Sequence, residues 1–202
     1  MIIITPDIIG NKELELIHAI SWNDRLILHL RSSVYKESEI ESILRDMDSS
    51  IYPFIAIHNH PQLVKKHVLL NRIHLSERHT EWITDIPEDT TWTISTSVHD
   101  IHTFNRLHRR FSYAFISPVF PSISKKDYKQ TLDFKMDNIK ERTNDHTKLI
   151  ALGGIHSQNI QELITMGYDD VALCGYIWQT QAPSIALERV RFAQSVLEHA
   201  ND

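Results

Sequence analysis

The chain has 202 residues, of which 42% are hydrophobic and 23% charged, and its formal net charge is −5. This composition is ordinary for a soluble globular domain. The net negative charge argues against a general nucleic-acid-binding protein, and no apolar run approaches the roughly 20 residues of a membrane-spanning helix. The single cysteine excludes an internal disulfide. Because the first residues also lack the basic region of a secretory signal, we expect a cytoplasmic protein.

Apolar runs typical of β-strands alternate with helical patterns along the chain. We expect strands at Ile2–Thr5, Arg25–Leu30, Phe54–His58, Arg72–Leu75, Trp92–Thr96, Tyr113–Ser117, Lys148–Leu152 and Asp170–Cys174. We expect helices at Lys12–Ser21, Glu37–Asp46, Pro61–Leu69, a short turn after Thr80, Ile101–Arg109, Phe134–Arg142, Ser157–Met166 and Pro183–His199.

Strict alternation of this kind predicts a parallel sheet covered by helices, the α/β class. Eight units in about 200 residues is the lower size limit of a (β/α)8 TIM barrel. We therefore predict one barrel domain over residues 1–202. A doubly wound open sheet also alternates, but it usually has five or six strands.

Polar residues stand at the carboxyl ends of the expected strands, where a barrel of this class holds its active site. In the second strand, Ile27, His29 and Arg31 share one face, while the intervening leucines share the other. An inward-facing histidine and arginine are costly unless they bind something. A ligand site is one interpretation, and an internal salt bridge is the other.

The run His58-Asn59-His60 places two histidines on one face of the third strand end. With His29 or His74 nearby, they could hold a transition metal. No fixed ligand motif such as His-Glu-x-x-His is present. Stacking on a heterocycle, or hydrogen bonding to one, is an equal alternative.

A loop rich in hydroxyls follows the sixth expected strand. Ser122 and Ser124 can donate hydrogen bonds to phosphate oxygens, and Lys125 can neutralise their charge. A solvated surface loop is the alternative. The position of the loop, facing the glycines described next, favours phosphate.

Three of the five glycines follow the last two expected strands, as Gly153-Gly154 and Cys174-Gly175. A glycine just past a strand lets the backbone approach a ligand closely, and a following helix offers free N–H groups to an anion. We expect a phosphate site here; two tight turns without a ligand are the alternative. Cys174 is expected to be a small core residue.

These segments together resemble the thiamine phosphate synthase/TenI family of small (β/α)8 barrels, over most of the chain. The matching segments are Arg72-Ile73-His74-Leu75 with "GVHLG", Ser97-Val98-His99 with "S-x-H-S/T", residues 117–125 with "GPVFPTxTK", residues 151–155 with "AIGGI", and His29-Leu30-Arg31 with "QLR".

The resemblance implies a role in thiamine biosynthesis, in which a hydroxymethylpyrimidine diphosphate is joined to a thiazole phosphate with release of diphosphate. In the family mechanism diphosphate leaves first, and the thiazole nitrogen captures a pyrimidine methyl cation. The positions carried over for the diphosphate are Arg31, Ser97, Ser122, Ser124 and Lys125. Those for the thiazole phosphate are Gly153, Gly154, Cys174 and Gly175, and Asn59 is expected on the pyrimidine side. His74 is a further expected substrate-binding residue. The expected catalytic residues are Arg31, Ser122, Ser124, Lys125 and His29. The partners are these two small molecules, and a homo-oligomer is one option.

The sequence departs from the synthase pattern at the diphosphate end. The family binds Mg²⁺ through two aspartates, and those positions are His60 and His79 here, which are poor ligands for Mg²⁺. The family's lysine after "QLR" is Ser33. The TenI branch of the family, a thiazole tautomerase, needs neither metal nor diphosphate. Its catalytic histidine corresponds to Pro118, so His29 or His99 would have to act as general acid and base. A non-catalytic barrel that binds a thiamine precursor is the third hypothesis.

Overall fold

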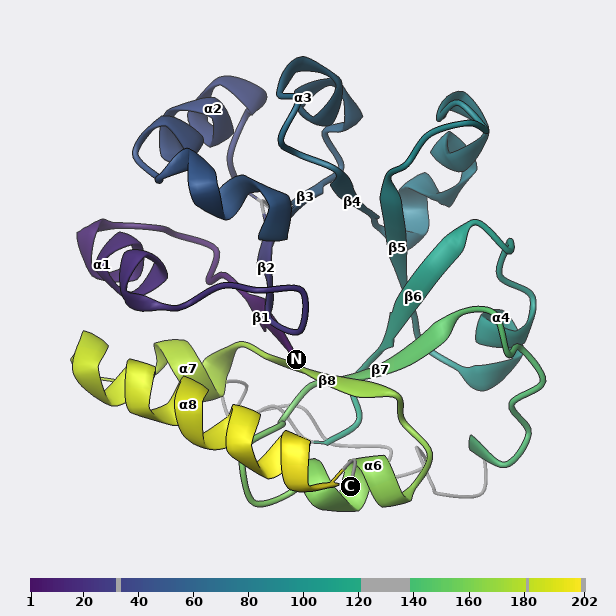
Figure 1. Cartoon of the computed structure of the whole chain (residues 1–202). Coiled ribbons are helices and arrows are strands. Elements are labelled where there is room, and N and C mark those ends of the chain that lie inside the picture. Colours follow the sequence, from purple (N-terminus) through teal and green to yellow (C-terminus); the bar gives the residue numbers. More distant parts are fainter. Residues whose placement is uncertain (32–33, 121–138, 181, 201–202) are drawn as a thin grey trace.

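Eight parallel strands close into a barrel in the order β1-β2-β3-β4-β5-β6-β7-β8 in the computed structural model (Figure 1). The structure describes residues 1–31, 34–120, 139–180 and 182–200. The strands are β1 (Ile2–Ile4), β2 (Ile27–Leu30), β3 (Ile55–His58), β4 (Arg72–Leu75), β5 (Thr93–Val98), β6 (Phe111–Ile116), β7 (Lys148–Leu152) and β8 (Asp170–Leu173). β1 pairs with both β2 and β8, which closes the ring. The predicted (β/α)8 barrel is confirmed.

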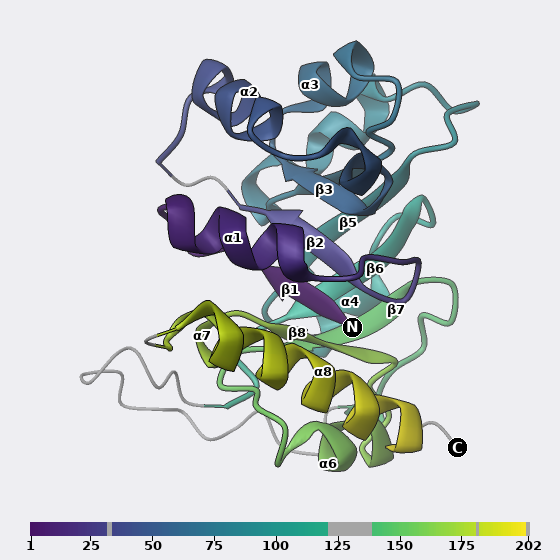
Figure 2. The ribbon, with the colours of Figure 1, turned by 60° about the vertical axis from the view of Figure 1, so that its left-hand side comes forward.

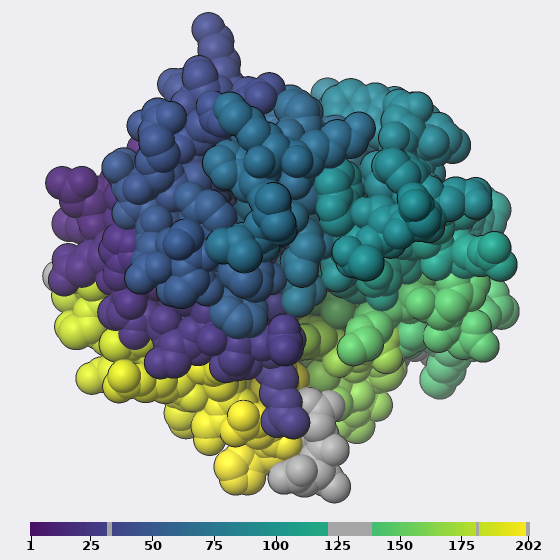
Figure 3. Space-filling view, turned by 45° about the horizontal axis from the view of Figure 1, so that its top comes forward, coloured from purple at the N-terminus to yellow at the C-terminus, as the bar shows by residue number. Residues whose placement is uncertain are grey.

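Helices cover the outside of the barrel. They are α1 (Asn11–Ala19), α2 (Glu37–Arg45), α3 (Pro61–Lys66), α4 (Ile101–Asn105), α6 (Ile160–Thr165), α7 (Gly175–Trp178) and α8 (Pro183–Ala200), with 3₁₀ helices η1 (Ser49–Phe54) and η2 (Glu77–Asp85). Figure 2 shows α1 beside α8, where the two ends of the chain pack together. The same contact appears on the surface in Figure 3, where the purple and yellow segments adjoin.

The helices differ from the predicted ones in a few places. The unit after β4, predicted as a short turn after Thr80, is the 3₁₀ helix η2, which begins earlier, at Glu77. α3 ends at Lys66, because His67 adopts an extended backbone. The sequence pattern did not predict η1 or α7. Most of the predicted helix Phe134–Arg142 lies outside the described residues.

Each strand buries both of its faces, as parallel strands under a helical cover do. Ile2 and Ile4 point into the barrel, whereas Ile3 packs against the helices. The alternation predicted for β2 is confirmed, since Ile27 lies with the inner residues and Leu28 with the outer ones. Fully burying one such side chain contributes roughly 1.5–3 kcal/mol. Within the described part of the chain, no helix is both long and apolar enough to cross a membrane.

The inner layer of the barrel also contains polar residues on five neighbouring strands. His58 and His74 occupy paired positions on β3 and β4, His74 is paired with Ser95 on β5, and Ser95 with Tyr113 on β6. His29 comes from β2. The parallel register therefore brings these polar side chains together inside the barrel.

Candidate functional site

His29, His58 and His74, which we call the histidine cluster, meet inside the barrel below its carboxyl end. The exposed fractions of the three residues are 0%, 8% and 2%. His29 Nδ1 lies 3.0 Å from His58 Nε2, and His29 Nε2 lies 2.6 Å from the Tyr113 hydroxyl. A buried polar group needs such partners. These contacts fix the imidazoles in place.

The two ring nitrogens of His74 face two serines of β5. His74 Nδ1 is 3.0 Å from Ser95 Oγ, and Nε2 is 3.1 Å from Ser97 Oγ. Ser95 also donates to the carbonyl oxygen of Ile73, at 3.3 Å. Its oxygen is therefore left to accept a hydrogen bond from His74 Nδ1–H, which leaves the lone pair on Nε2.

Burial keeps the histidine cluster neutral. It lowers the pKa of His29 and of His58 well below the ordinary value of 6.5, and it lowers the pKa of His74 to about 3. The ring of Phe115 adds an apolar wall, with centroid distances of 4.8 Å to His29 and 5.2 Å to His74. His29, a predicted catalytic residue, therefore lies inside the barrel without exposed surface.

Arg31 lies at the barrel mouth, the end of the barrel where the strands have their carboxyl ends. Its side chain is 49% exposed, and its Nη2 is 3.6 Å from Asp7 Oδ1. Its charge contributes to the low pKa of His74 after burial, and to that of His58 after burial and the other two histidines of the cluster. It also acts against the raised pKa of Cys174 on the far side of β1. Arg31 is therefore close enough to β3, β4 and β8 for its charge to act on side chains of all three strands.

The glycines after β7 have a steric reason to be there. Gly153 has φ +105°, and a Cβ at this residue would lie 3.0 Å from the Cα of Pro118. The segment after β6 runs alongside, with Val119 N donating to Leu152 O and Phe120 N to Gly153 O. Gly154 has φ +63°. Two left-handed residues thus turn the chain sharply out of β7 and allow this close packing.

Gly175 lines an open pocket of about 510 Å³ between the loops after β7 and β8. The other lining residues are His156, Ser157, Gln158, Tyr176, Gln179 and Arg189. A Cβ on Gly175 would meet only the side chain of Gln179, at 3.4 Å. The backbone of Gly175 thus faces the pocket, with only the amide of Gln179 beside it, and a ligand could approach it where that flexible side chain turns away.

Tyr176 and Arg189 shape this pocket, and the sequence did not single out Arg189. Tyr176 donates from its hydroxyl to Ser157 Oγ at 3.0 Å. Arg189, on α8, donates to the carbonyl oxygen of Tyr176 at 2.7 Å, and its guanidinium carbon lies 5.0 Å from the centre of the Tyr176 ring. Arg189 brings a cation beside the glycines, where a barrel of this class binds phosphate. It lies in an ordinary helical pattern, so no local motif marks it.

The positions expected for Mg²⁺ do not form a magnesium site. His60 Nδ1 faces Gln62 Nε2 at 3.2 Å. His79 Nδ1 is 2.7 Å from Ser76 Oγ, and the His79 ring lies on Trp82 with 4.2 Å between centroids. Mg²⁺ prefers oxygen ligands in octahedral geometry, and these imidazoles have other partners. Among the described residues, neither belongs to the one group of three or more possible ligating side chains.

The remaining predicted residues fall in three places. Asn59 has φ +56°, its backbone N–H donates to His74 O, and its Oδ1 accepts from Ser76 N, so it holds the β3 and β4 loops together. Cys174 is partly buried, and burial raises the pKa of its thiol, as in a core residue. Ser122, Ser124 and Lys125 lie outside the described residues.

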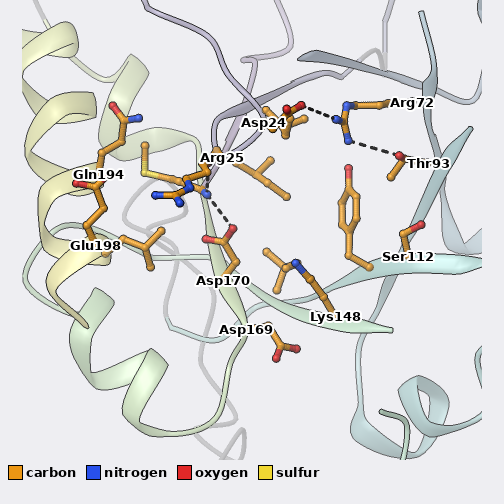
Figure 4. Close-up of a pocket in the computed structure, with 16 residues that line it drawn as sticks. Asp24, Arg25, Arg72, Thr93, Ser112, Lys148, Asp169, Asp170, Gln194 and Glu198 are labelled. Carbon is orange, nitrogen blue, oxygen red and sulfur yellow. Dashed lines mark hydrogen bonds and ion pairs between the residues drawn. The ribbon is translucent and has the colours of Figure 1, made fainter. Parts of the chain in front are cut away.

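A second pocket, of about 580 Å³, opens at the amino end of the barrel (Figure 4). Charged side chains line it, and several are paired: the Met1 ammonium lies 2.8 Å from Asp170 Oδ2, and Arg72 Nη2 lies 3.6 Å from Asp24 Oδ1. This end of a TIM barrel serves stability in general. We therefore place the candidate site at the opposite end, the mouth.

The chain is similar to known proteins both in part of its sequence and in its fold. A thiamine-phosphate synthase from Anoxybacillus flavithermus (strain DSM 21510 / WK1) is 28% identical over 89 residues, which is 44% of this chain and 41% of that protein. The matched stretch thus spans less than half of that relative.

Solved structures match over almost the whole chain. A thiamine phosphate pyrophosphorylase from Bacteroides thetaiotaomicron has a TM-score of 0.77 at 21% identity, with 98% of this chain and 97% of that chain covered. One from Pyrococcus furiosus has a TM-score of 0.70 at 14% identity, with 97% and 96% covered. At these identities the likeness establishes the fold. The family model described as thiamine monophosphate synthase matches residues 3–177. The chain therefore belongs to the thiamine monophosphate synthase family.

Proposed function

We propose that this protein couples a hydroxymethylpyrimidine diphosphate to a thiazole phosphate and releases diphosphate, a step of thiamine biosynthesis. Family membership supports the substrate class. The observation that carries the proposal is Arg31, a half-exposed guanidinium at the carboxyl end of β2 that lies 3.6 Å from Asp7. A cation fixed there can stabilise the negative charge that grows on a departing diphosphate.

The thiazole phosphate has a separate place in this proposal. The pocket beside Gly175, with Arg189 and the hydroxyl of Ser157 on its walls, suits a phosphate monoester. It follows β7 and β8, whereas Arg31 follows β2. The two anionic groups of the substrates would then bind at different sides of the mouth, with the reacting carbon and nitrogen between them.

The protein's own groups carry the proposed reaction. Arg31 and Ser97, with Ser122, Ser124 and Lys125 as the predicted partners beyond the described residues, would hold the diphosphate as its bond to the pyrimidine methylene breaks. The thiazole nitrogen then attacks the methylene cation. Because His60 and His79 do not fit Mg²⁺, no step here depends on that ion.

A thiazole tautomerase is the second candidate, and one arrangement favours it. His99 Nδ1 donates to the carbonyl oxygen of Ser117 at 2.6 Å, and its Nε2 lies 3.4 Å from Glu77 Oε2. The imidazole is 59% exposed at the mouth. An oriented, accessible histidine beside a carboxylate can move a proton on a substrate.

Incubation with both precursors distinguishes the two candidates. Coupling predicts thiamine phosphate and diphosphate as products, assayed with chelator and with Mg²⁺ or Mn²⁺ added. Arg31→Ala and Lys125→Ala should each abolish coupling, whereas Arg109→Ala, an exposed arginine on another loop, should not. Absence of product under every metal condition would refute coupling. Isomerisation of a thiazole carboxylate phosphate that Lys125→Ala leaves intact and His99→Gln abolishes would establish the second candidate.

A further inference from the structure

The histidine cluster has the atoms of a metal site. One nitrogen of each ring can be chosen so that all three lie within 4.8 Å of one another. Tetrahedral Zn²⁺ with bonds of about 2.0–2.1 Å separates its nitrogen ligands by roughly 3.4 Å. His29 Nδ1 and His58 Nε2 are 3.0 Å apart, so ring shifts of a few tenths of an ångström would suffice for this pair.

We propose that His29, His58 and His74 bind a divalent transition metal, with Zn²⁺ as the ion that three imidazoles suit best. Imidazole nitrogen is a common ligand of Zn²⁺, and three of them leave a fourth position open. This site is distinct from the family's oxygen-based Mg²⁺ positions, and it does not depend on the proposed coupling reaction.

Hydrogen bonds behind the rings match what a metal site requires. A ligating histidine usually donates its other ring N–H to a fixed acceptor, which orients the ring. The Ser95 oxygen accepts from His74 Nδ1–H and leaves Nε2 for the metal. The Tyr113 oxygen lies 2.6 Å from His29 Nε2 and can likewise accept a hydrogen bond from Nε2–H, which leaves His29 Nδ1 for the metal. Two of the three ligands thus have an outer partner in place.

The hydroxyl of Ser97 would border the metal. Its Oγ lies 3.1 Å from His74 Nε2, the nitrogen left for the metal, on the side of the mouth. The fourth position of the ion would be taken by a small oxygen ligand such as water, as in other sites with three protein ligands.

Cobalt and zinc binding to the full chain test the proposal. After removal of metal with a chelator, Co²⁺ should give the intense visible bands of a tetrahedral complex, and Zn²⁺ should displace it at one ion per chain. His58→Gln should abolish the bands and lower the stoichiometry to zero. His60→Gln is the matched control, because His60 lies two residues away and outside the cluster, and it should bind like the wild type.

Tyr113→Phe keeps all three ligands and the aromatic packing. Loss of its hydroxyl should weaken Co²⁺ and Zn²⁺ binding about 10–100-fold while one ion still binds per chain. Circular dichroism verifies that the three variants are folded. Absence of tetrahedral bands in the wild type would overturn the proposal, as would equal effects of His58→Gln and His60→Gln or unchanged affinity in Tyr113→Phe.

Discussion

The two sides of the barrel mouth use the carboxyl ends of their strands in opposite ways. On the β2–β5 side, the histidine cluster fills the interior, and its imidazoles bond to one another and to hydroxyls. On the β7–β8 side, glycines remove side chains, and a pocket opens between the loops. The first region, on the β2–β5 side, is a buried cluster of polar side chains. The second region, on the β7–β8 side, is a pocket lined partly by glycine backbone. Changes in the first should alter stability most, and changes in the second should alter ligand binding.

Acid should produce the largest effect on the first region. In the unfolded chain the cluster's imidazoles titrate near pH 6.5, whereas burial lowers their pKa in the folded protein, for His74 to about 3. Between these values the unfolded state binds more protons, so the free energy of unfolding decreases as pH falls. The stabilisation is fully present above pH 6.5 and is lost toward the folded pKa.

Below pH 6.5, the free energy of unfolding should fall by about 1.4 kcal/mol per pH unit for each imidazole that becomes charged on unfolding. Urea unfolding with chelator at about pH 7.5 and about pH 5.5 measures it. Equal free energies of unfolding at the two pH values would show that the cluster is not buried as described.

The next largest effect is expected for His29→Ala. This change leaves a cavity and removes the partner of both His58 and the Tyr113 hydroxyl. We expect the free energy of unfolding to fall by about 3 kcal/mol. The control is His102→Ala, on the exposed side of α4, which should change it by less than about 0.5 kcal/mol. Similar losses in both variants would contradict the structure.

Replacing Gly153, in the second region, should strain the backbone and lower the free energy of unfolding. Gly153→Ala places a Cβ 3.0 Å from the backbone of Pro118 at φ +105°, so we expect a loss of about 1–3 kcal/mol in urea unfolding. Gly10→Ala is the control, since its Cβ would meet only the carboxylate of Glu13, at 3.4 Å. Gly10 is the N-cap of α1, where alanine is disfavoured, so that variant should lose about 0.5–1 kcal/mol, less than Gly153→Ala.

The smallest effect on stability, but a clear one on binding, is expected for Arg189→Gln. Loss of the cation beside Gly175 should weaken binding of a thiazole phosphate about fivefold in calorimetric titration. Arg191→Gln removes an exposed cation from the same helix and should leave the affinity unchanged. A comparable loss in both variants would point to general charge instead of this pocket.

Local sequence patterns predicted the strands well, together with which of their side chains face the inside of the barrel. β4 and β7 begin and end at the predicted residues, because apolar runs bounded by polar residues mark buried strands. Alternation also placed His29 inside the barrel. The hydrogen bond from His29 to Tyr113 joins residues 84 positions apart, and Arg189 reaches the β8 loop from α8. Such contacts depend on barrel stagger and helix docking, which no local pattern encodes.

Closure of the ring has a consequence for association. β1 is hydrogen-bonded to both β2 and β8, so the described strands present no open edge to a second chain. Backbone pairing between copies is thereby excluded for this barrel. A homo-oligomer of this barrel would instead use side chains on the helices and loops; among the described residues, Phe192 on α8 is an exposed aromatic ring, at 58%.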